Sequence, residues 1–168
     1  MTQTKVFKAR PSAGWVWLGG LGILFLFMGI GTALIETPLS GESLLSLLLS
    51  GGLGIYFIAL AAWFPTLRYE LDEEALTLIY GPVLRYRIPL QEIREMQRTN
   101  LKISLWSSMR MPGIALFVVP YRDIGRVKMC ATAAATDILL IQTDHGQYGI
   151  TPLNEEALIK TIQQRIKA

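Results

Sequence analysis

Two long apolar stretches dominate the first part of the chain and contrast with the alternating pattern that follows them. Residues 13–35 and 44–64 contain no charged side chain over 23 and 21 positions. A helix of roughly 20 apolar residues crosses the hydrocarbon core of a membrane and satisfies its own backbone hydrogen bonds there. The pattern therefore predicts a hairpin of two transmembrane helices within residues 13–64.

The flanking residues indicate which way this hairpin lies. The join, residues 36–43, has no lysine or arginine, whereas cations precede the first stretch and follow the second: Lys5, Lys8, Arg10 and Arg68. Because lysine and arginine are retained on the cytoplasmic side, we expect a two-pass protein of the cytoplasmic (inner) membrane with both termini in the cytoplasm.

Aromatic residues support the same orientation. They cluster at the two ends that would meet the cytoplasmic interface, where tryptophan is a frequent anchor: Trp15, Trp17, Trp63 and Phe64. A cleavable signal peptide is the alternative for the first stretch. Its apolar region usually spans about 7 to 15 residues, so the observed length favours an uncleaved anchor.

Small residues predict where the two helices pack. In an antiparallel pair, five of them share the outer half of the bilayer and allow close approach of the backbones: Gly29, Ala33, Ser46, Ser50 and Gly54. Gly19, Gly20 and Gly22 lie nearer the cytoplasm and either face a different partner or reflect the ordinary tolerance of membrane helices for glycine. Neither stretch contains an aspartate, glutamate, lysine, arginine or histidine, which argues against a transport pathway.

From Leu67 onward, short apolar runs alternate with turn residues. They predict strands at 67–72, 76–80, 84–90, 93–99, 115–120, 126–132, 138–143 and 148–151, with a tight hairpin at Asp144-His145-Gly146. A C-terminal helix follows, because Leu158, Ile162 and Ile166 form one apolar stripe. That stripe should close an open end of the sheet.

The order of these parts resembles bacterial pleckstrin-homology-like (bacterial PH) domains. Residues 68–81 followed by Arg87-Ile-Pro-Leu-Gln-Glu-Ile93 are similar to the opening strands and the "isoleucine–proline–leucine–x–x–isoleucine" turn of that family. Residues 111–152 are similar to a branch in which a membrane hairpin often precedes the domain, although Thr151-Pro152 replaces the usual "serine–proline". The resemblance covers residues 66–168. It implies an α+β domain, a partly open antiparallel β-barrel capped by a C-terminal helix and used to bind lipids, peptides or proteins.

Candidate contact residues lie in and after the irregular segment 101–113. Within it are Lys102, Trp106, Met109, Arg110 and Met111, and beyond it are Arg122, Arg126 and Lys128. Three readings stay open for the segment: its apolar side chains enter the membrane interface while its cations face lipid phosphates, it contacts another membrane protein, or Trp106 packs under a loop. Arg85 and Arg87 form a further pair, since alternate strand residues share one face.

Catalytic chemistry has little support in the sequence. A single cysteine, Cys130, excludes a multi-cysteine metal site, and Cys130 with His145 lacks a third orienting group. We expect no enzyme activity, no cofactor and no metal. The net charge is +3, but the basic residues are scattered, so nucleic acid is not an expected partner.

These observations predict three parts: a cytoplasmic basic N-terminus (1–12), the transmembrane hairpin (13–64) and a cytoplasmic PH-like domain (66–168). The preferred hypothesis is a non-enzymatic, membrane-anchored binding module that acts as a scaffold, assembly factor or accessory subunit for a membrane protein or for copies of itself. The alternative is a sensor of anionic lipid headgroups at the cytoplasmic leaflet.

Overall fold

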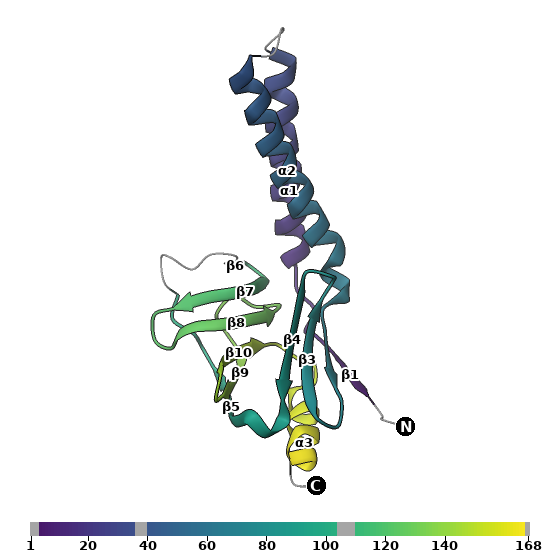
Figure 1. Cartoon of the computed structure of the whole chain (residues 1–168), viewed down its shortest axis with the longest axis vertical. Coiled ribbons are helices and arrows are strands. Elements are labelled where there is room, and N and C mark those ends of the chain that lie inside the picture. The colour runs from purple at the N-terminus through teal and green to yellow at the C-terminus, as the bar shows by residue number, and fades with distance from the viewer. Residues whose placement is uncertain (1–3, 36–39, 104–109, 167–168) are drawn as a thin grey trace. The chain divides into compact units, whose positions relative to one another are not determined.

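The computed structural model describes residues 4–35, 40–103 and 110–166, and the chain divides into two compact units. One unit is the segment Ala13–Phe64, which contains two helices (Figure 1). The other unit combines Met1–Ser12 with Pro65–Ala168 and contains the sheets and the C-terminal helix.

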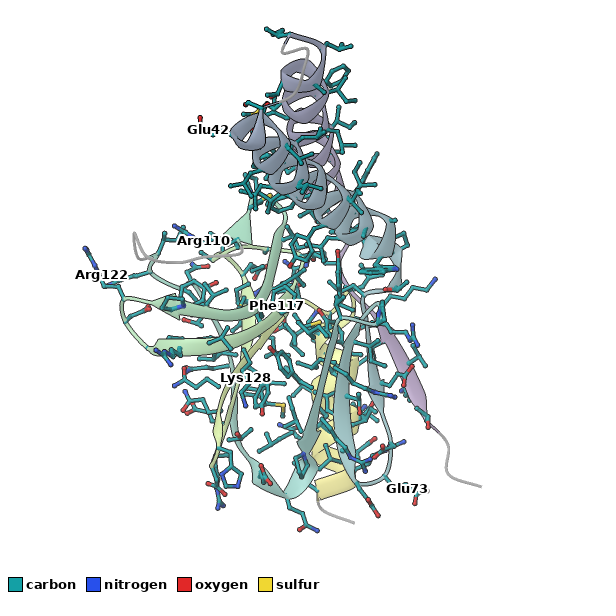
Figure 2. All side chains as sticks on the ribbon, turned by 45° about the horizontal axis from the view of Figure 1, so that its top comes forward. Glu42, Glu73, Arg110, Phe117, Arg122 and Lys128 are labelled. Carbon is teal, nitrogen blue, oxygen red and sulfur yellow. The ribbon has the colours of Figure 1, made fainter. Side chains whose placement is uncertain are left out.

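The helical unit is an antiparallel pair, α1 (Gly14–Ile35) and α2 (Gly41–Trp63). Helix α2 begins three residues before the predicted apolar stretch, because Ser40 caps it: the Ser40 hydroxyl oxygen accepts a hydrogen bond from the Ser43 N–H at 3.2 Å. Glu42 lies in the first turn (Figure 2), where a negative charge complements the helix dipole. Residues 41–43, predicted as part of the join, therefore belong to helix α2.

Both helices expose apolar side chains all around. Large hydrophobic residues are solvent-accessible along both helices, among them Trp17, Phe27, Leu34, Leu48 and Ile55. In the most apolar 18-residue segment of each helix, only 17% (α1) and 22% (α2) of the segment is buried. A helix that is apolar on every side needs an apolar environment. The two helices are long and apolar enough to cross a membrane.

The helices pack closely against each other at Gly22, Gly29 and Gly54. A Cβ atom added to Gly22 would lie 2.9 Å from the carbonyl oxygen of Gly54, so only glycine allows this crossing. Farther along, a Cβ added to Gly29 would lie 2.6 Å from the hydroxyl oxygen of Ser50. Of the five residues assigned to helix packing, Gly29, Ser50 and Gly54 are buried, Ala33 is half-buried and Ser46 is exposed. Gly22, left without an assigned partner by the sequence, belongs to the contact.

The first sheet of the domain has four antiparallel strands in the order β1-β2-β3-β4. They span Lys5–Lys8 (β1), Arg68–Leu71 (β2), Ala75–Tyr80 (β3) and Leu84–Pro89 (β4). A short 3-10 helix, Phe64–Thr66, leads into β2, and another, Leu90–Glu92, follows β4. The basic N-terminal segment contributes strand β1, which the sequence analysis did not predict: Lys5–Lys8 pair with β2, and Phe7 is buried.

The second sheet has six strands in the order β5-β9-β10-β8-β7-β6. They span Ile93–Thr99 (β5), Arg110–Met111 (β6), Ile114–Tyr121 (β7), Gly125–Ala131 (β8), Ile138–Thr143 (β9) and Gly146–Ile150 (β10). All eight predicted strands are present, whereas β1 and β6 were not predicted. The expected all-antiparallel arrangement is wrong at one place: β10 runs parallel to β8. After β8 the chain leaves a gap one strand wide, and the β9–β10 hairpin returns β10 into that gap.

The two sheets do not close into a barrel, and helix α3 (Glu155–Ile166) packs with the first of them. The side-chain oxygen of Asn154 accepts from the Ala157 N–H at 3.3 Å and caps the helix. Leu158 and Ile162 are buried, while Ile166 at the end of the predicted stripe is exposed. The guanidinium of Arg165 donates to the carbonyl oxygen of Leu71 at 3.1 Å, which fixes the end of α3 against β2.

Buried side chains cover both faces of the second sheet. One face meets the first sheet, where the Cys130 thiol lies 3.9 Å from the carbonyl oxygen of Ile79. The opposite face carries a separate cluster under the segments around Leu101 and Ala135, consisting of Leu101, Ala115, Val119, Tyr121, Val127, Met129, Ala131, Ala135, Ile138 and Leu140. Residues that alternate along β7 and β8 therefore enter different cores.

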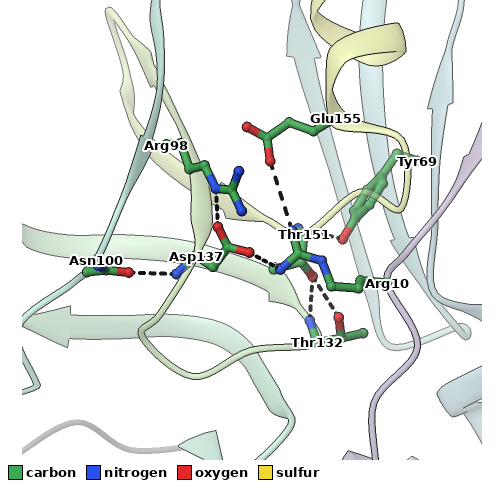
Figure 3. A network of polar contacts seen from close by, with 8 residues as sticks. All are labelled: Arg10, Tyr69, Arg98, Asn100, Thr132, Asp137, Thr151 and Glu155. Atoms are coloured by element: carbon green, nitrogen blue, oxygen red, sulfur yellow. Dashed lines mark hydrogen bonds and ion pairs between the residues drawn. The ribbon is translucent and has the colours of Figure 1, made fainter.

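A polar network joins the sheets to the N-terminal segment (Figure 3). The hydroxyl of Tyr69 on β2 donates to the carbonyl oxygen of Cys130 at 2.8 Å and accepts from the Thr151 N–H at 3.1 Å. Nearby, Asp137 forms ion pairs with Arg10 and with Arg98. Through Arg10 and Asp137, the N-terminal segment is held to the start of β9 and to the end of β5.

Candidate binding surface

The turn between β7 and β8 lies next to Lys102, a residue that precedes β7 in the sequence. Gly125 adopts a φ of +78°, a conformation that glycine tolerates, and closes the turn opposite Tyr121. The Arg122 N–H donates to the carbonyl oxygen of Lys102 at 2.9 Å, and the Lys102 N–H lies 3.2 Å from a carboxylate oxygen of Asp123. Two of the predicted contact residues, Lys102 and Arg122, are therefore neighbours.

Strand β8 supplies the next two cations by simple alternation. Val127 and Met129 enter the cluster on one face, so Arg126 and Lys128 project from the other. Their cross-strand neighbours on β7 are Pro120 and Val118. Val118 is 44% exposed, and Ile103, which bridges to Tyr121, is 50% exposed. Figure 2 shows Arg122 at the outer end of the hairpin and Lys128 farther along the strands. We call these residues, Lys102, Ile103, Val118, Pro120, Arg122, Arg126 and Lys128, the hairpin surface.

The cations of the hairpin surface lack carboxylate partners. Elsewhere among the described residues, five arginines form ion pairs with carboxylates: Arg10, Arg68, Arg87, Arg94 and Arg98. By contrast, Lys102, Arg122, Arg126 and Lys128 form no ion pair within the described segments 4–35, 40–103 and 110–166. The surface is therefore positive, and it can attract an anionic ligand.

The remaining predicted contact residues are distributed differently. Arg110 and Met111 form the short strand β6 and are half-buried. Burial raises the pKa of Tyr121 to about 12, and the nearby Arg110 charge opposes that rise. Trp106 and Met109 lie outside the described residues. On β4, Arg87 pairs with Glu74 at 3.3 Å, while Arg85 is exposed.

Strand β7 holds one unusual backbone conformation beside the hairpin surface. Phe117, labelled in Figure 2, has a φ of +64°, although it lies in the middle of a strand and is not glycine. A bulky residue in this region costs on the order of 1 to 3 kcal/mol and persists only where its surroundings hold it. The neighbouring position Val118 is the exposed residue of the strand.

Tyr148 adjoins Lys128 and in turn contacts Tyr86, and the sequence analysis singled out neither tyrosine. The Lys128 ammonium donates to the Tyr148 hydroxyl at 3.2 Å and lies 4.9 Å from the centre of that ring. The Tyr148 ring contacts the ring of Tyr86 edge to face, with 6.0 Å between centres. Tyr148 belongs to β10 and Tyr86 to β4, so this contact links the two sheets. Strand alternation predicts the face of each residue but not which strands become neighbours.

The predicted interface anchors and the titratable residues have the following surroundings. Trp15 and Trp17 are exposed, and Trp63 and Phe64 are half-buried.

Burial raises the pKa of the Cys130 thiol to about 12, so it is not a thiolate at neutral pH. His145 lies at the β9–β10 turn, exposed, 3.8 Å from a carboxylate oxygen of Glu92. The described part of the chain contains no group of three or more histidine, cysteine, aspartate or glutamate residues placed to hold a metal ion.

Comparison with known proteins agrees with this architecture. No curated protein and no solved structure matches the chain. A family described as "Bacterial PH domain" matches residues 67–166, which is more than half of the chain and confirms the resemblance seen in the sequence. The matched segment begins at the residue before β2 and ends with α3. The chain therefore belongs to the bacterial PH domain family.

Proposed function

We propose that this protein is a non-enzymatic binding module anchored in the inner membrane by the α1–α2 hairpin, with its PH-like domain in the cytoplasm. The exposed apolar surface of both helices supports the anchor. Soluble proteins rarely expose contiguous apolar patches of more than a few hundred Å², whereas here nearly every large side chain along two helices of 22 and 23 residues is apolar. Lipid is the environment in which such a hairpin is stable.

The pairing of β1 with β2 supports the same compartment for both ends of the hairpin. Strand β1 ends at Lys8, shortly before α1, and β2 begins at Arg68, shortly after α2. Lys8 and Arg68 are Cα partners in the antiparallel ladder, and such partners lie about 4.5 to 5.5 Å apart. Two chain ends held this closely belong on one side of a bilayer, and the cations around them favour the cytoplasmic side.

The hairpin surface supports binding to another membrane protein or to a second copy of this chain, in the role of scaffold, assembly factor or accessory subunit. The single observation that carries this proposal is a set of cations that form no ion pair with any described carboxylate and that lie next to exposed Val118 and Ile103. Arginine is enriched at protein interfaces, and the buried centre of an interface is more apolar than its rim. Because the hairpin confines the domain to a membrane, a weak contact gains effective concentration.

Photo-crosslinking in intact membranes tests this proposal. A benzophenone amino acid replaces Val118, and a control places it at Gln163, an exposed position on α3. We expect a protein adduct from position 118, a much weaker one from position 163, and loss of the adduct after the double change Arg122→Glu and Arg126→Glu. Equal adducts from both positions, or none from position 118, would contradict the proposal.

A second candidate function is recognition of anionic lipid headgroups. It is favoured by the four cations of the hairpin surface, each worth about 1 kcal/mol near an anionic membrane. In nanodiscs, hydrogen exchange of residues 114–131 should slow when phosphatidylglycerol replaces part of the phosphatidylcholine, and this protection should disappear at high salt. Exchange that is independent of lipid charge would exclude this role and leave protein recognition.

We propose no enzyme activity because the surroundings of Cys130 and His145, the two residues best suited to catalysis, do not favour it. Cys130 is fully buried and its raised pKa disfavours a thiolate nucleophile. Its hydrogen-bond acceptor is a backbone carbonyl, at Ile79, rather than a general base. His145 is exposed in a turn, and its imidazole lies 3.8 Å from a carboxylate oxygen of Glu92.

A further inference from the structure

Lys128 occupies an unusual place for an unpaired lysine. Its ammonium lies against the ring and the hydroxyl of Tyr148, and Tyr148 in turn contacts Tyr86. A cation over an aromatic face is attracted by the electron-rich ring. The ammonium is thus held in position between two sheets instead of extending freely into water.

The Lys128 ammonium and the hydroxyls of Tyr86 and Tyr148 each keep at least one N–H or O–H donor for which no acceptor is found among the described residues. The Tyr148 oxygen accepts from Lys128, so the Tyr148 proton remains available. The Tyr86 hydroxyl makes no hydrogen bond with any described residue, and burial raises the pKa of Tyr86, so it stays protonated at neutral pH. An ammonium has three N–H donors, and only one of them is used here.

The same face of the second sheet offers no negative charge to complete the cluster. The strand register places on this face Leu116, Val118 and Pro120 from β7, Arg126, Lys128 and Cys130 from β8, Leu139, Ile141 and Thr143 from β9, and Gly146, Tyr148 and Ile150 from β10. None of these described residues is acidic, and Arg126 adds a second cation one alternate position from Lys128. Because Lys128 and Arg126 form no ion pair with any described residue, a protein partner is the source that we consider for the anion.

We propose that Lys128, Tyr86 and Tyr148 bind a carboxylate group carried by an acidic side chain of a protein partner. This inference rests on the proposed function and names the chemistry that the hairpin surface recognises. One ammonium and two phenol donors match the single charge and the two oxygens of a carboxylate. A phosphate dianion usually takes several cations or a bidentate arginine.

The surroundings of the cluster favour a carboxylate that is part of a protein segment. Val118 and Pro120 lie on the same face beside the cations, and they offer apolar contact to the residues that flank an acidic side chain. A free carboxylate such as acetate would gain the polar contacts only. The polar contacts fix the orientation, and the apolar contacts add affinity.

Titration of the full chain in a nonionic detergent tests the inference. The readout is the ring signals of ¹³C-labelled tyrosine, assigned with Tyr86→Phe and Tyr148→Phe. The probes are an N-acetylated tripeptide amide with glutamate between two valines, the same peptide with glutamine, and acetate. We expect saturable shifts of the Tyr86 and Tyr148 signals with the glutamate peptide, and affinities at least tenfold weaker for the glutamine peptide and for acetate.

Variants assign the effect to the cluster. Lys128→Met keeps the aliphatic stem and should weaken the glutamate peptide at least tenfold, and Tyr86→Phe should weaken it severalfold. Lys160→Met, a change at an exposed lysine on α3, is the control and should leave binding unchanged. Equal binding of the glutamate and glutamine peptides, or undiminished binding to Lys128→Met, would overturn the carboxylate site. Acetate binding as tightly as the glutamate peptide would overturn the protein-borne source.

The outcome is separable from that of the proposed function. If position 118 crosslinks a protein and Lys128→Met does not change this adduct, the binding module stands and the carboxylate site fails. If the glutamate peptide binds as expected but position 118 yields no protein adduct in membranes, the site stands and the proposed partner role fails.

Discussion

Replacing Tyr69 with phenylalanine removes one oxygen atom at the point where three strands meet. The Tyr69 hydroxyl bridges the carbonyl oxygen of Cys130, at the end of β8, and the N–H of Thr151, just after β10. The side chain is completely buried, so water cannot replace the lost bonds. Burial raises the pKa of Tyr69 above that of a free phenol, so the hydroxyl remains a donor over the usual pH range.

The expected loss of stability follows from the two groups left unpaired. A buried donor or acceptor without a partner costs about 1 to 3 kcal/mol, and a carbonyl oxygen, with two lone pairs, lies at the low end. The Thr151 N–H loses its partner outright. We therefore expect Tyr69→Phe to lower the free energy of unfolding of the domain by about 2 to 4 kcal/mol.

Urea unfolding of the full chain in detergent, followed by circular dichroism in the β region, measures this loss. With a slope of about 1 to 3 kcal/mol per M urea, the midpoint should fall by about 0.7 to 4 M. Tyr86→Phe is the matched control, because the Tyr86 hydroxyl has no hydrogen bond with the described residues, and it should change stability by less than about 0.5 kcal/mol. Equal midpoints for the two variants would refute the role assigned to the Tyr69 network.

Two further predictions concern the helix crossing and the ion-pair cluster. Gly22→Ala should lower the melting temperature of the helical unit, since its Cβ would lie 2.9 Å from the Gly54 carbonyl oxygen, whereas Gly20→Ala meets nothing within 4 Å and should not; equal melting curves would contradict the crossing. The hydrogen bond from Arg98 is the largest cause that lowers the pKa of Asp137 to about 2, so the carboxylate contributes stability above its unfolded pKa of about 4 and loses it toward pH 2. The urea midpoints of wild type and Asp137→Asn should therefore differ above pH 5 and converge toward pH 2. A difference between the midpoints that does not change with pH would contradict this ion pair.

Features that depend on local pattern could be predicted from the sequence. Uncharged runs marked α1 and α2, and alternation marked eight strands. Strand β1 was missed because Lys5-Val6-Phe7-Lys8 is only four residues long and is rich in the cations expected beside a membrane span. The crossing at Gly22 was missed because helix rotation, which sequence spacing does not determine, selects the glycines that face each other.

The candidate site was likewise predicted from the sequence only in part. Alternation placed Arg126 and Lys128 on one face of a strand, and the structure agrees. The neighbours of Lys128 depend on long-range pairing, because β10 inserts beside β8 in parallel and brings Tyr148 to Lys128. Tyr86 then reaches Tyr148 from a different sheet. Such contacts depend on how the two sheets pack against each other, so local sequence patterns do not predict them.

Thiol labelling in intact cells tests the membrane hairpin and the position of the domain in one measurement. Single cysteines replace Glu42, exposed in the first turn of α2, and Arg122, exposed at the hairpin tip. The native Cys130 is fully buried and contributes little background. A membrane-impermeant maleimide should label Glu42→Cys in intact cells and Arg122→Cys only after lysis. Labelling of both positions from the same side of the membrane would contradict the account.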